Sequence, residues 1–143
     1  MLSIGTLREE CAQLNIPVLP FCLPENGSVS LWDGQDGYAI GMDAAALDGG
    51  KQERVHLAHE LGHCVTGSFY NRHTPFDTRL RHEYRADKWA IRRLISEEAL
   101  DEAIAAGCTE IWALAEHFGV TEEFMRKAVC LHVHGNVAAE LYF

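Results

Sequence analysis

The sequence lacks the features that mark several classes of protein. It has only 4 prolines and 5 cysteines in 143 residues, and no two cysteines form a CxxC pair. An odd number of widely spaced cysteines does not build a disulfide scaffold, so we expect reduced thiols. No stretch approaches the roughly 18 consecutive apolar residues of a membrane span. Residues 1–13 lack a basic segment followed by an apolar run, so no secretory signal is recognised and a cytoplasmic protein is expected.

Positive charge is also scarce. Lys and Arg total 12 against 21 Asp and Glu, which gives a formal net charge of −9. Such a protein repels phosphate backbones and anionic lipids, which disfavours nucleic acid and membranes as partners. The remaining composition, 48% hydrophobic and 23% charged, is that of a globular protein of ordinary type. We therefore expect one domain over residues 1–143.

The spacing of hydrophobic residues predicts an α+β fold. Residues 7–14 have the spacing of a short amphipathic helix, and prolines restrict residues 16–23 to an edge strand or an extended connector. Two β-prone runs, 29–32 and 38–42, flank a Gly-rich turn and predict a small antiparallel sheet. We interpret the second run either as an exposed edge that aligns an extended peptide or as an ordinary edge strand.

From residue 51 onward the hydrophobic spacing is helical. Ser96 and Thr121 are placed as N-caps, each followed by two glutamates that suit the positive end of a helix. The expected helices span residues 51–66, 79–95, 97–106, 109–118 and 121–131. The predicted organisation is an N-terminal helix and sheet (1–47), the helices of the candidate site (51–95), a helical hairpin region (96–131) and a tail (132–143).

The helix predicted at 51–66 contains an HExxH sequence, from His59 to His63. Residues four apart lie one above the other on a helix, so both imidazoles can reach one zinc ion. Glu60 is angled toward the same ion, where it can take a proton from a zinc-bound water and return it to a leaving amine. The alternative is a polar stripe on the exposed face of an amphipathic helix.

Two histidines hold a zinc ion incompletely, and the next predicted helix offers a third ligand. Glu83 and Asp87 lie four residues apart on one face, and Ala86 and Ala90 are small enough for two helices to approach closely. We expect Glu83 to bind zinc and Asp87 to accept the outer N–H of His59. The alternative is that both carboxylates pair with arginines on the surface.

The two motifs together resemble the ImmA/IrrE family of zinc metallopeptidases. The resemblance rests on LAHELGH at residues 57–63 and on the Glu-x-x-Ala-Asp-x-x-Ala pattern at residues 83–90. It implies a gluzincin-like fold in which a small sheet packs on the HExxH helix and the glutamate helix. It also implies a zinc cofactor, with His59, His63 and Glu83 as zinc ligands and Glu60 as the general base.

The resemblance further implies a protein substrate. Family members are often found in prophages, integrative elements or stress responses, and characterised members make a limited cut in a helix-turn-helix repressor. Two positions depart from the pattern of many members, because Arg85 replaces a second glutamate and Trp89 replaces a phenylalanine. Arg85 lies off the Glu83 face of the helix, so the ligand set is preserved while the local charge differs.

A peptidase also needs a donor that stabilises the oxyanion. Tyr70 and His73 lie on the loop between the two ligand helices, and either can fold over the zinc as an oxyanion donor or as part of a lid. An ordinary packed or solvated loop residue is the alternative for each. His56 lies nearly on the face of His59, and we interpret it as a rim residue because another imidazole ligand would close the site to water.

Residues 111–124 have the rhythm of a helix-turn-helix, but the second helix opens with Glu122 and Glu123, which DNA phosphates repel. We therefore favour an αα-hairpin that packs over the core and forms part of a docking surface for the partner. The apolar side chains expected to make this packing are Trp112, Leu114, Phe118, Val120, Phe124, Met125 and Val129.

Three functions are compatible with these motifs. The first is a zinc endopeptidase that makes a limited cut in a regulatory protein. The second is a regulatory binding protein that keeps the zinc fold without cutting, although such a protein has no need of the base Glu60. The third is a structural zinc module, which requires a fourth protein ligand such as Cys64 or His73.

Overall fold

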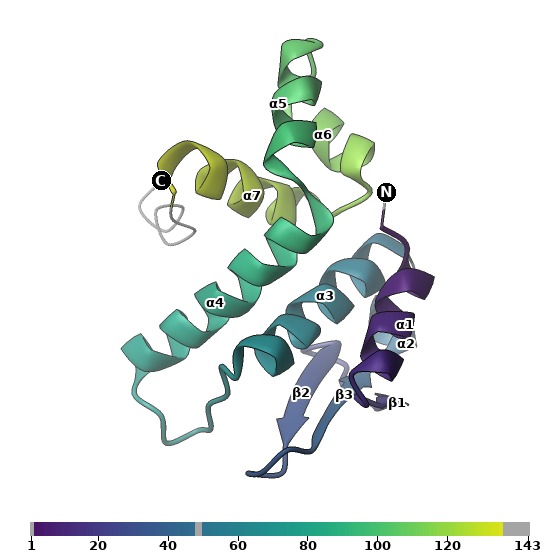
Figure 1. Ribbon diagram of the computed structural model, residues 1–143, viewed down its shortest axis with the longest axis vertical. Helices are drawn as coiled ribbons and strands as arrows, with labels where there is room; N and C mark the ends of the chain where they lie inside the picture. Colours follow the sequence, from purple (N-terminus) through teal and green to yellow (C-terminus); the bar gives the residue numbers. More distant parts are fainter. Residues whose placement is uncertain (1, 48–49, 136–143) are drawn as a thin grey trace.

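The computed structural model describes residues 2–47 and 50–135, and it has the predicted α+β fold (Figure 1). Most helices and strands in the described residues begin and end close to the predicted positions, and the last helix extends to His134. The short helix at Ala44–Leu47 was not predicted. The remainder of the predicted tail, residues 136–143, lies outside the described residues. The elements are α1 (Ile4–Gln13), β1 (Val18–Pro20), β2 (Ser28–Trp32), β3 (Tyr38–Met42), α2 (Ala44–Leu47), α3 (Gly50–Thr66), α4 (Phe76–Leu94), α5 (Glu97–Ala105), α6 (Ile111–Phe118) and α7 (Glu122–His134).

Two of the helix starts follow directly from local side-chain chemistry. The Ser96 hydroxyl accepts a hydrogen bond from the backbone N–H of Ala99, and the Thr121 hydroxyl accepts one from Phe124. Each bond satisfies one of the free N–H groups in the first turn of a helix. The predicted N-caps of α5 and α7 are therefore confirmed. No helix in the described part of the chain is long and apolar enough to cross a membrane.

The sheet is mixed, which corrects the prediction of a purely antiparallel one. Its strand order is β1-β3-β2, with β2 antiparallel to β3 and β1 parallel to β3. The prediction that residues 38–42 form an exposed edge is wrong, because β3 is the central strand and Ile40 is fully buried. The edges are β1 and β2. Pro17, just before β1, contributes only its carbonyl, which accepts from the N–H of Ile40, so a proline is tolerated at this position.

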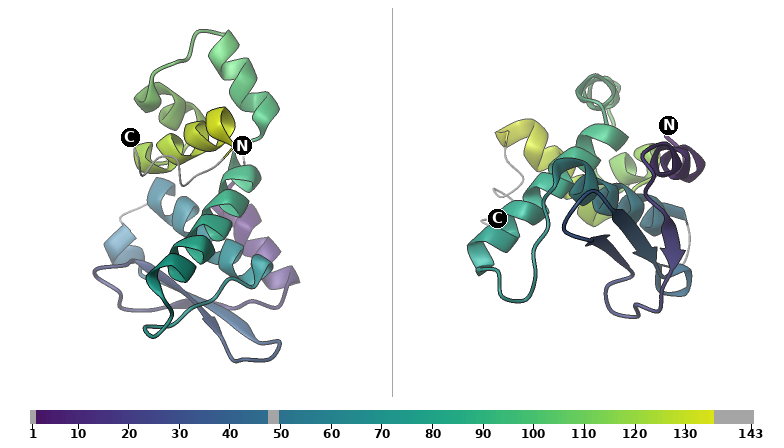
Figure 2. Two further views of the ribbon diagram at one scale, coloured as in Figure 1. Left: turned by 90° about the vertical axis from the view of Figure 1, so that its left-hand side faces the viewer. Right: turned by 60° about the horizontal axis from the view of Figure 1, so that its bottom comes forward.

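Helix α3 is the central element of the fold, with the sheet on one side and α4 on the other (Figure 2). Its residues Leu57, Ala58 and Leu61 are fully buried. Arg54, also on α3, donates hydrogen bonds to the carbonyls of Leu2, Phe118 and Gly119, which ties the start of the described chain and the turn between α6 and α7 to this helix. Because α3 packs between the sheet and α4, the side chains that it directs toward β2 and α4 have well-defined positions.

The C-terminal helices form the predicted αα-hairpin. Gly119 ends α6 in the left-handed conformation, with φ of +65°, and α7 then packs on α4. Most of the apolar side chains assigned to this packing are buried, but Trp112 is 64% exposed, so the prediction for that residue is wrong. Helix α6 is a short helix of 8 residues, and its buried face is occupied by Leu114, Ala115 and Phe118. The side chain of Trp112 therefore lies on the opposite face.

Candidate metal centre

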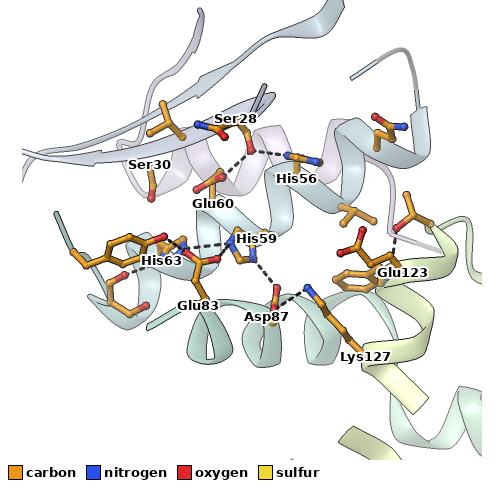
Figure 3. A pocket seen from close by; sticks show the side chains of 18 of the residues that line it. Ser28, Ser30, His56, His59, Glu60, His63, Glu83, Asp87, Glu123 and Lys127 are labelled. Atoms are coloured by element: carbon orange, nitrogen blue, oxygen red, sulfur yellow. Dashed lines mark hydrogen bonds and ion pairs between the residues drawn. The ribbon is translucent and has the colours of Figure 1, made fainter. Parts of the chain in front are cut away.

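The two histidines of the HExxH sequence and a carboxylate from α4 meet at one point (Figure 3). The Nε2 atoms of His59 and His63 are 3.2 Å apart. The two carboxylate oxygens of Glu83 lie 2.9 Å from His59 Nε2 and 3.0 Å from His63 Nε2. Glu60 also belongs to this group, since one ligand atom from each of His59, Glu60 and His63 can be chosen within 4.8 Å of one another.

In each imidazole, the hydrogen-bond partner of Nδ1 determines whether the other ring nitrogen, Nε2, is free to bind a metal ion. His59 Nδ1 lies 2.7 Å from Asp87 Oδ1, and His63 Nδ1 lies 2.5 Å from the carbonyl oxygen of Ser68. Both partners are acceptors, so both Nδ1 atoms carry the proton and donate it. The two Nε2 atoms therefore direct lone pairs toward the Glu83 carboxylate, which is the arrangement of histidine ligands around a metal ion.

With the rings singly protonated, His59 Nε2, His63 Nε2 and the Glu83 carboxylate can all accept a hydrogen bond and none can donate one. Three such groups are stable side by side only around a positive charge. A tetrahedral zinc ion, with ligand bonds of about 2.0–2.2 Å, places neighbouring ligand atoms about 3.3 Å apart. The separations of 2.9, 3.0 and 3.2 Å among His59, His63 and Glu83 are close to that value. Two imidazoles and one carboxylate are also the donor set of catalytic zinc sites with an open fourth position. The residues present thus fit a zinc ion.

The pKa values of the side chains at the site also show that a positive charge is stabilised between them. Burial disfavours the charged form of His59. In that form a second proton, on Nε2, lets the ring donate to Glu83 as well as to Asp87, and these hydrogen bonds outweigh burial and raise its pKa to about 10. Burial likewise favours the neutral form of Glu83 and Asp87, yet hydrogen bonds from the histidines lower the pKa of both carboxyls below their usual values. A bound cation, either a proton or a metal ion, is therefore stabilised here.

Asp87 is predicted to set the metal affinity through His59. Its second oxygen, Oδ2, lies 3.2 Å from Lys127 Nζ on α7, so the carboxylate is held from two sides. We expect Asp87→Ala to lower zinc affinity about 10- to 100-fold, because His59 loses the partner that fixes its tautomer and ring orientation. Competition with a chromogenic chelator measures the affinity. Asp77→Ala, at an exposed position in the first turn of the same helix, is the control, and equal affinities for both variants would contradict the assignment.

Glu60 lies beside the metal position and is held from the side of the sheet. Its Oε2 accepts a 2.7 Å hydrogen bond from the hydroxyl of Ser28, the first residue of β2. The same hydroxyl lies 2.7 Å from His56 Nδ1. Burial, opposed in part by the charge of Glu60, lowers the pKa of His56, so this ring is neutral at neutral pH. His56, which the sequence placed at the rim of the site and outside the ligand set, is among the residues that line the cleft.

The loop between α3 and α4 brings one of its two candidate residues to the site. The Tyr70 hydroxyl donates a 2.7 Å hydrogen bond to Glu83 Oε1, and burial together with this bond raises its pKa to about 12, so the phenol keeps its proton. His73 is exposed, contacts Asn71 and Arg72, and does not line the cleft. Cys64 does not line it either. Among the described residues, neither candidate for a fourth protein ligand is therefore at the metal position.

The site opens into a cleft of about 790 Å³. Three of its walls were not predicted: Ser28 and its neighbours on β2, the polar turn before β2, and the start of α7. No sequence signal could have identified Ser28 or Lys127, because a single serine or lysine has no motif and each reaches the site from an element far away in the chain. Lining residues from these walls are Glu25, Asn26, Ser28, Val29, Ser30, Thr121, Glu123, Phe124 and Lys127.

Comparison with known proteins identifies the family. A family model described as IrrE N-terminal-like domain, Peptidase_M78, matches residues 45–129. No curated protein and no solved structure matches the chain. The matched segment covers more than half of the chain and contains the HExxH sequence, the glutamate helix and most of α7. The chain belongs to the Peptidase_M78 family of IrrE N-terminal-like domains.

Proposed function

We propose that this protein is a zinc endopeptidase that makes a limited cut in a regulatory protein, a helix-turn-helix repressor of a mobile element or stress response. The observation that carries the proposal is the meeting of His59 Nε2, His63 Nε2 and the Glu83 carboxylate beside the carboxylate of Glu60. Membership of a peptidase family supports the reaction. The repressor rests on the ImmA/IrrE resemblance alone, and such a substrate implies that the enzyme acts in the cytoplasm.

Each residue has a distinct part in the proposed reaction. His59, His63 and Glu83 would hold a zinc ion, and a bound zinc ion would supply Lewis-acid chemistry, lowering the pKa of water and polarising the substrate carbonyl. Glu60 takes a proton from the attacking water and transfers it to the leaving amine as the peptide bond breaks. Tyr70, protonated at neutral pH and adjacent to Glu83, is the candidate donor to the oxyanion in place of His73.

The edge strand β2 supplies a template for an extended substrate. One side of β2 pairs with β3, and its residues Ser28, Val29 and Ser30 line the cleft that contains the metal position. An extended peptide can pair with the free edge of a strand through its main chain, which aligns it without regard to most of its side chains. The sequence suggested that residues 38–42 align an extended peptide. We propose this role for β2 instead.

The proposal is tested by measuring metal content and cleavage together. The zinc-loaded protein is incubated with the helix-turn-helix repressor encoded nearest to it, beside His59→Ala and Glu83→Ala. We expect one zinc per chain and a single cut for the natural protein, and loss of both for the two variants, because two ligands hold zinc too weakly. Elemental analysis and mass spectrometry of the fragments give the readout. Undiminished zinc in either variant would overturn the ligand assignment, and a zinc-loaded protein that cuts no repressor would overturn the substrate.

A further inference from the structure

The hydroxyl of Ser28 forms a bridge between Glu60 and His56 that lies outside both sequence motifs. The two contacts, to Glu60 Oε2 and to His56 Nδ1, are each 2.7 Å long. Ser28 and Glu60 are both only 7% exposed. Within residues 2–47 and 50–135, Ser28 is the one hydrogen-bond partner of the Glu60 side chain. The bridge joins the first residue of the edge strand to the candidate base on α3 (Figure 3).

The local backbone fixes where this hydroxyl lies. Gly27, just before it, has φ of +77°, and a Cβ there would come within 2.5 Å of the Leu47 side chain. Its carbonyl accepts a 2.8 Å hydrogen bond from the N–H of Asp43, and Ser28 is then in register with Met42. A glycine turn and the central strand β3 therefore set the start of β2, and with it the position of the Ser28 side chain over α3.

The chemistry of the three groups allows one direction for the bridge. A carboxylate in the charged form required of a base can only accept, so the single proton of Ser28 Oγ is donated to Glu60. The contact with His56 must then be a donation from His56 Nδ1–H to Ser28 Oγ. A neutral imidazole has one N–H, so the proton of His56 is on Nδ1 and absent from Nε2.

We propose that Ser28 is the positioning residue for Glu60, and that His56 fixes the direction of the Ser28 hydroxyl. The inference rests on the proposed peptidase function and deepens it. With Oε2 occupied by Ser28, the other oxygen of Glu60 is left to accept the proton of the attacking water. Because the hydrogen bond to a buried, charged acceptor is strong, it holds the carboxylate in one orientation throughout the transfer. The edge strand that would align the peptide thereby also aligns the base.

The first test reads the direction of the bridge without any substrate. Long-range ¹H–¹⁵N NMR of the zinc-loaded protein distinguishes the two tautomers of a neutral histidine, and His56→Gln identifies the signals of His56. We expect the Nδ1–H tautomer in the natural protein and a shift toward Nε2–H in Ser28→Ala, because Nδ1–H loses its acceptor. Ser30→Ala is the matched control, since Ser30 lines the same cleft two residues along β2 and its hydroxyl makes no hydrogen bond to another described residue. An Nε2–H tautomer in the natural protein would overturn the proposal.

The second test measures cleavage of the repressor. Loss of one hydrogen bond to a charged group predicts that Ser28→Ala lowers kcat about 10- to 100-fold, with KM and zinc content unchanged. Ser28→Thr keeps the hydroxyl and is expected to recover most of kcat. Thr109→Ala also removes a hydroxyl, but from an exposed position outside the cleft, and is expected to retain the natural kcat. A structural role alone would instead lower the melting temperature or raise KM without recovery by threonine. Natural kcat in Ser28→Ala would overturn the positioning role.

The two tests separate failure of this inference from failure of the proposed function. If the natural protein cuts no repressor but His56 has the Nδ1–H tautomer that depends on Ser28, the bridge stands and the assigned substrate is wrong. If the protein cuts the repressor and Ser28→Ala cuts it equally well, the peptidase stands and Ser28 does not position the base.

Discussion

Replacing Glu60 by glutamine is expected to lower the rate of repressor cleavage about 10²- to 10⁴-fold, the usual contribution of a general base. Glutamine has nearly the same shape as glutamate and can still accept the hydrogen bond from Ser28 through its carbonyl oxygen. It cannot take a proton from water at neutral pH. The loss should therefore appear in kcat. The proposed metal ligands His59, His63 and Glu83 are untouched, so zinc content is expected to stay at one per chain.

The same variant separates the peptidase from a protein that only binds its partner. A binding protein would keep its regulatory effect in Glu60→Gln, because no proton transfer is involved. We therefore expect relief of repression to disappear together with cleavage, measured with a reporter under the control of the repressor. Glu53→Gln, at a half-buried position in the first turn of α3 that does not line the cleft, is the control for charge. If Glu60→Gln relieves repression as well as the natural protein does, the peptidase reading is wrong.

Replacing Gly62 by alanine is expected to lower the free energy of unfolding by about 1–3 kcal/mol, through overpacking where α3 and α4 touch. A Cβ at Gly62 would lie 2.7 Å from the carbonyl oxygen of Ala86 and 3.1 Å from its Cα. These are backbone atoms, so no side-chain rotation relieves the clash and α4 must move away. Where a Cβ meets no clash, replacing a glycine inside a helix by alanine raises the free energy of unfolding by about 1 kcal/mol. A decrease in Gly62→Ala would therefore indicate the clash with α4.

The same shift should also weaken the metal site. Glu83 lies three residues before Ala86 on α4 and Asp87 directly after it, so both move with the point of contact. We expect lower zinc affinity in Gly62→Ala together with the lower stability, both measurable by denaturation of the metal-free and zinc-loaded protein. Gly50→Ala is the control, since a Cβ at Gly50, the first residue of the same helix, meets nothing within 4 Å. Unchanged stability in Gly62→Ala would show that the two helices are not in the contact described.

The order and type of most elements were predictable because they depend on neighbours in the chain. The helical spacing from residue 51 onward and the caps Ser96 and Thr121 are local signals, and the structure agrees with both. The partners of a strand are not local. Residues 18–20 pair in parallel with residues 38–42 across a gap of about twenty residues, and nothing in a three-residue strand encodes its partner or direction.

The candidate site also contains residues that the sequence could identify and residues that it could not. His59 and His63 share a helix face by spacing alone, and Glu60 follows from being next to His59. The choice between Tyr70 and His73 could not be made from sequence, since both lie on one loop whose path is set by packing. Tyr70 donates to Glu83 and His73 lies in the outer part of the loop.

By itself, the sequence determined which residues can bind a metal, because the repeat of the α-helix converts spacing into a shared face. It also determined the family, through two motifs carried on α3 and α4. Only the tertiary structure decided that β3 is central, that β2 borders the cleft, and that Ser28 and Lys127 complete the surroundings of Glu60 and Asp87. The physical reason is that these contacts join residues 32 and 40 positions apart, and such pairings arise from burial of the whole core rather than from any local pattern.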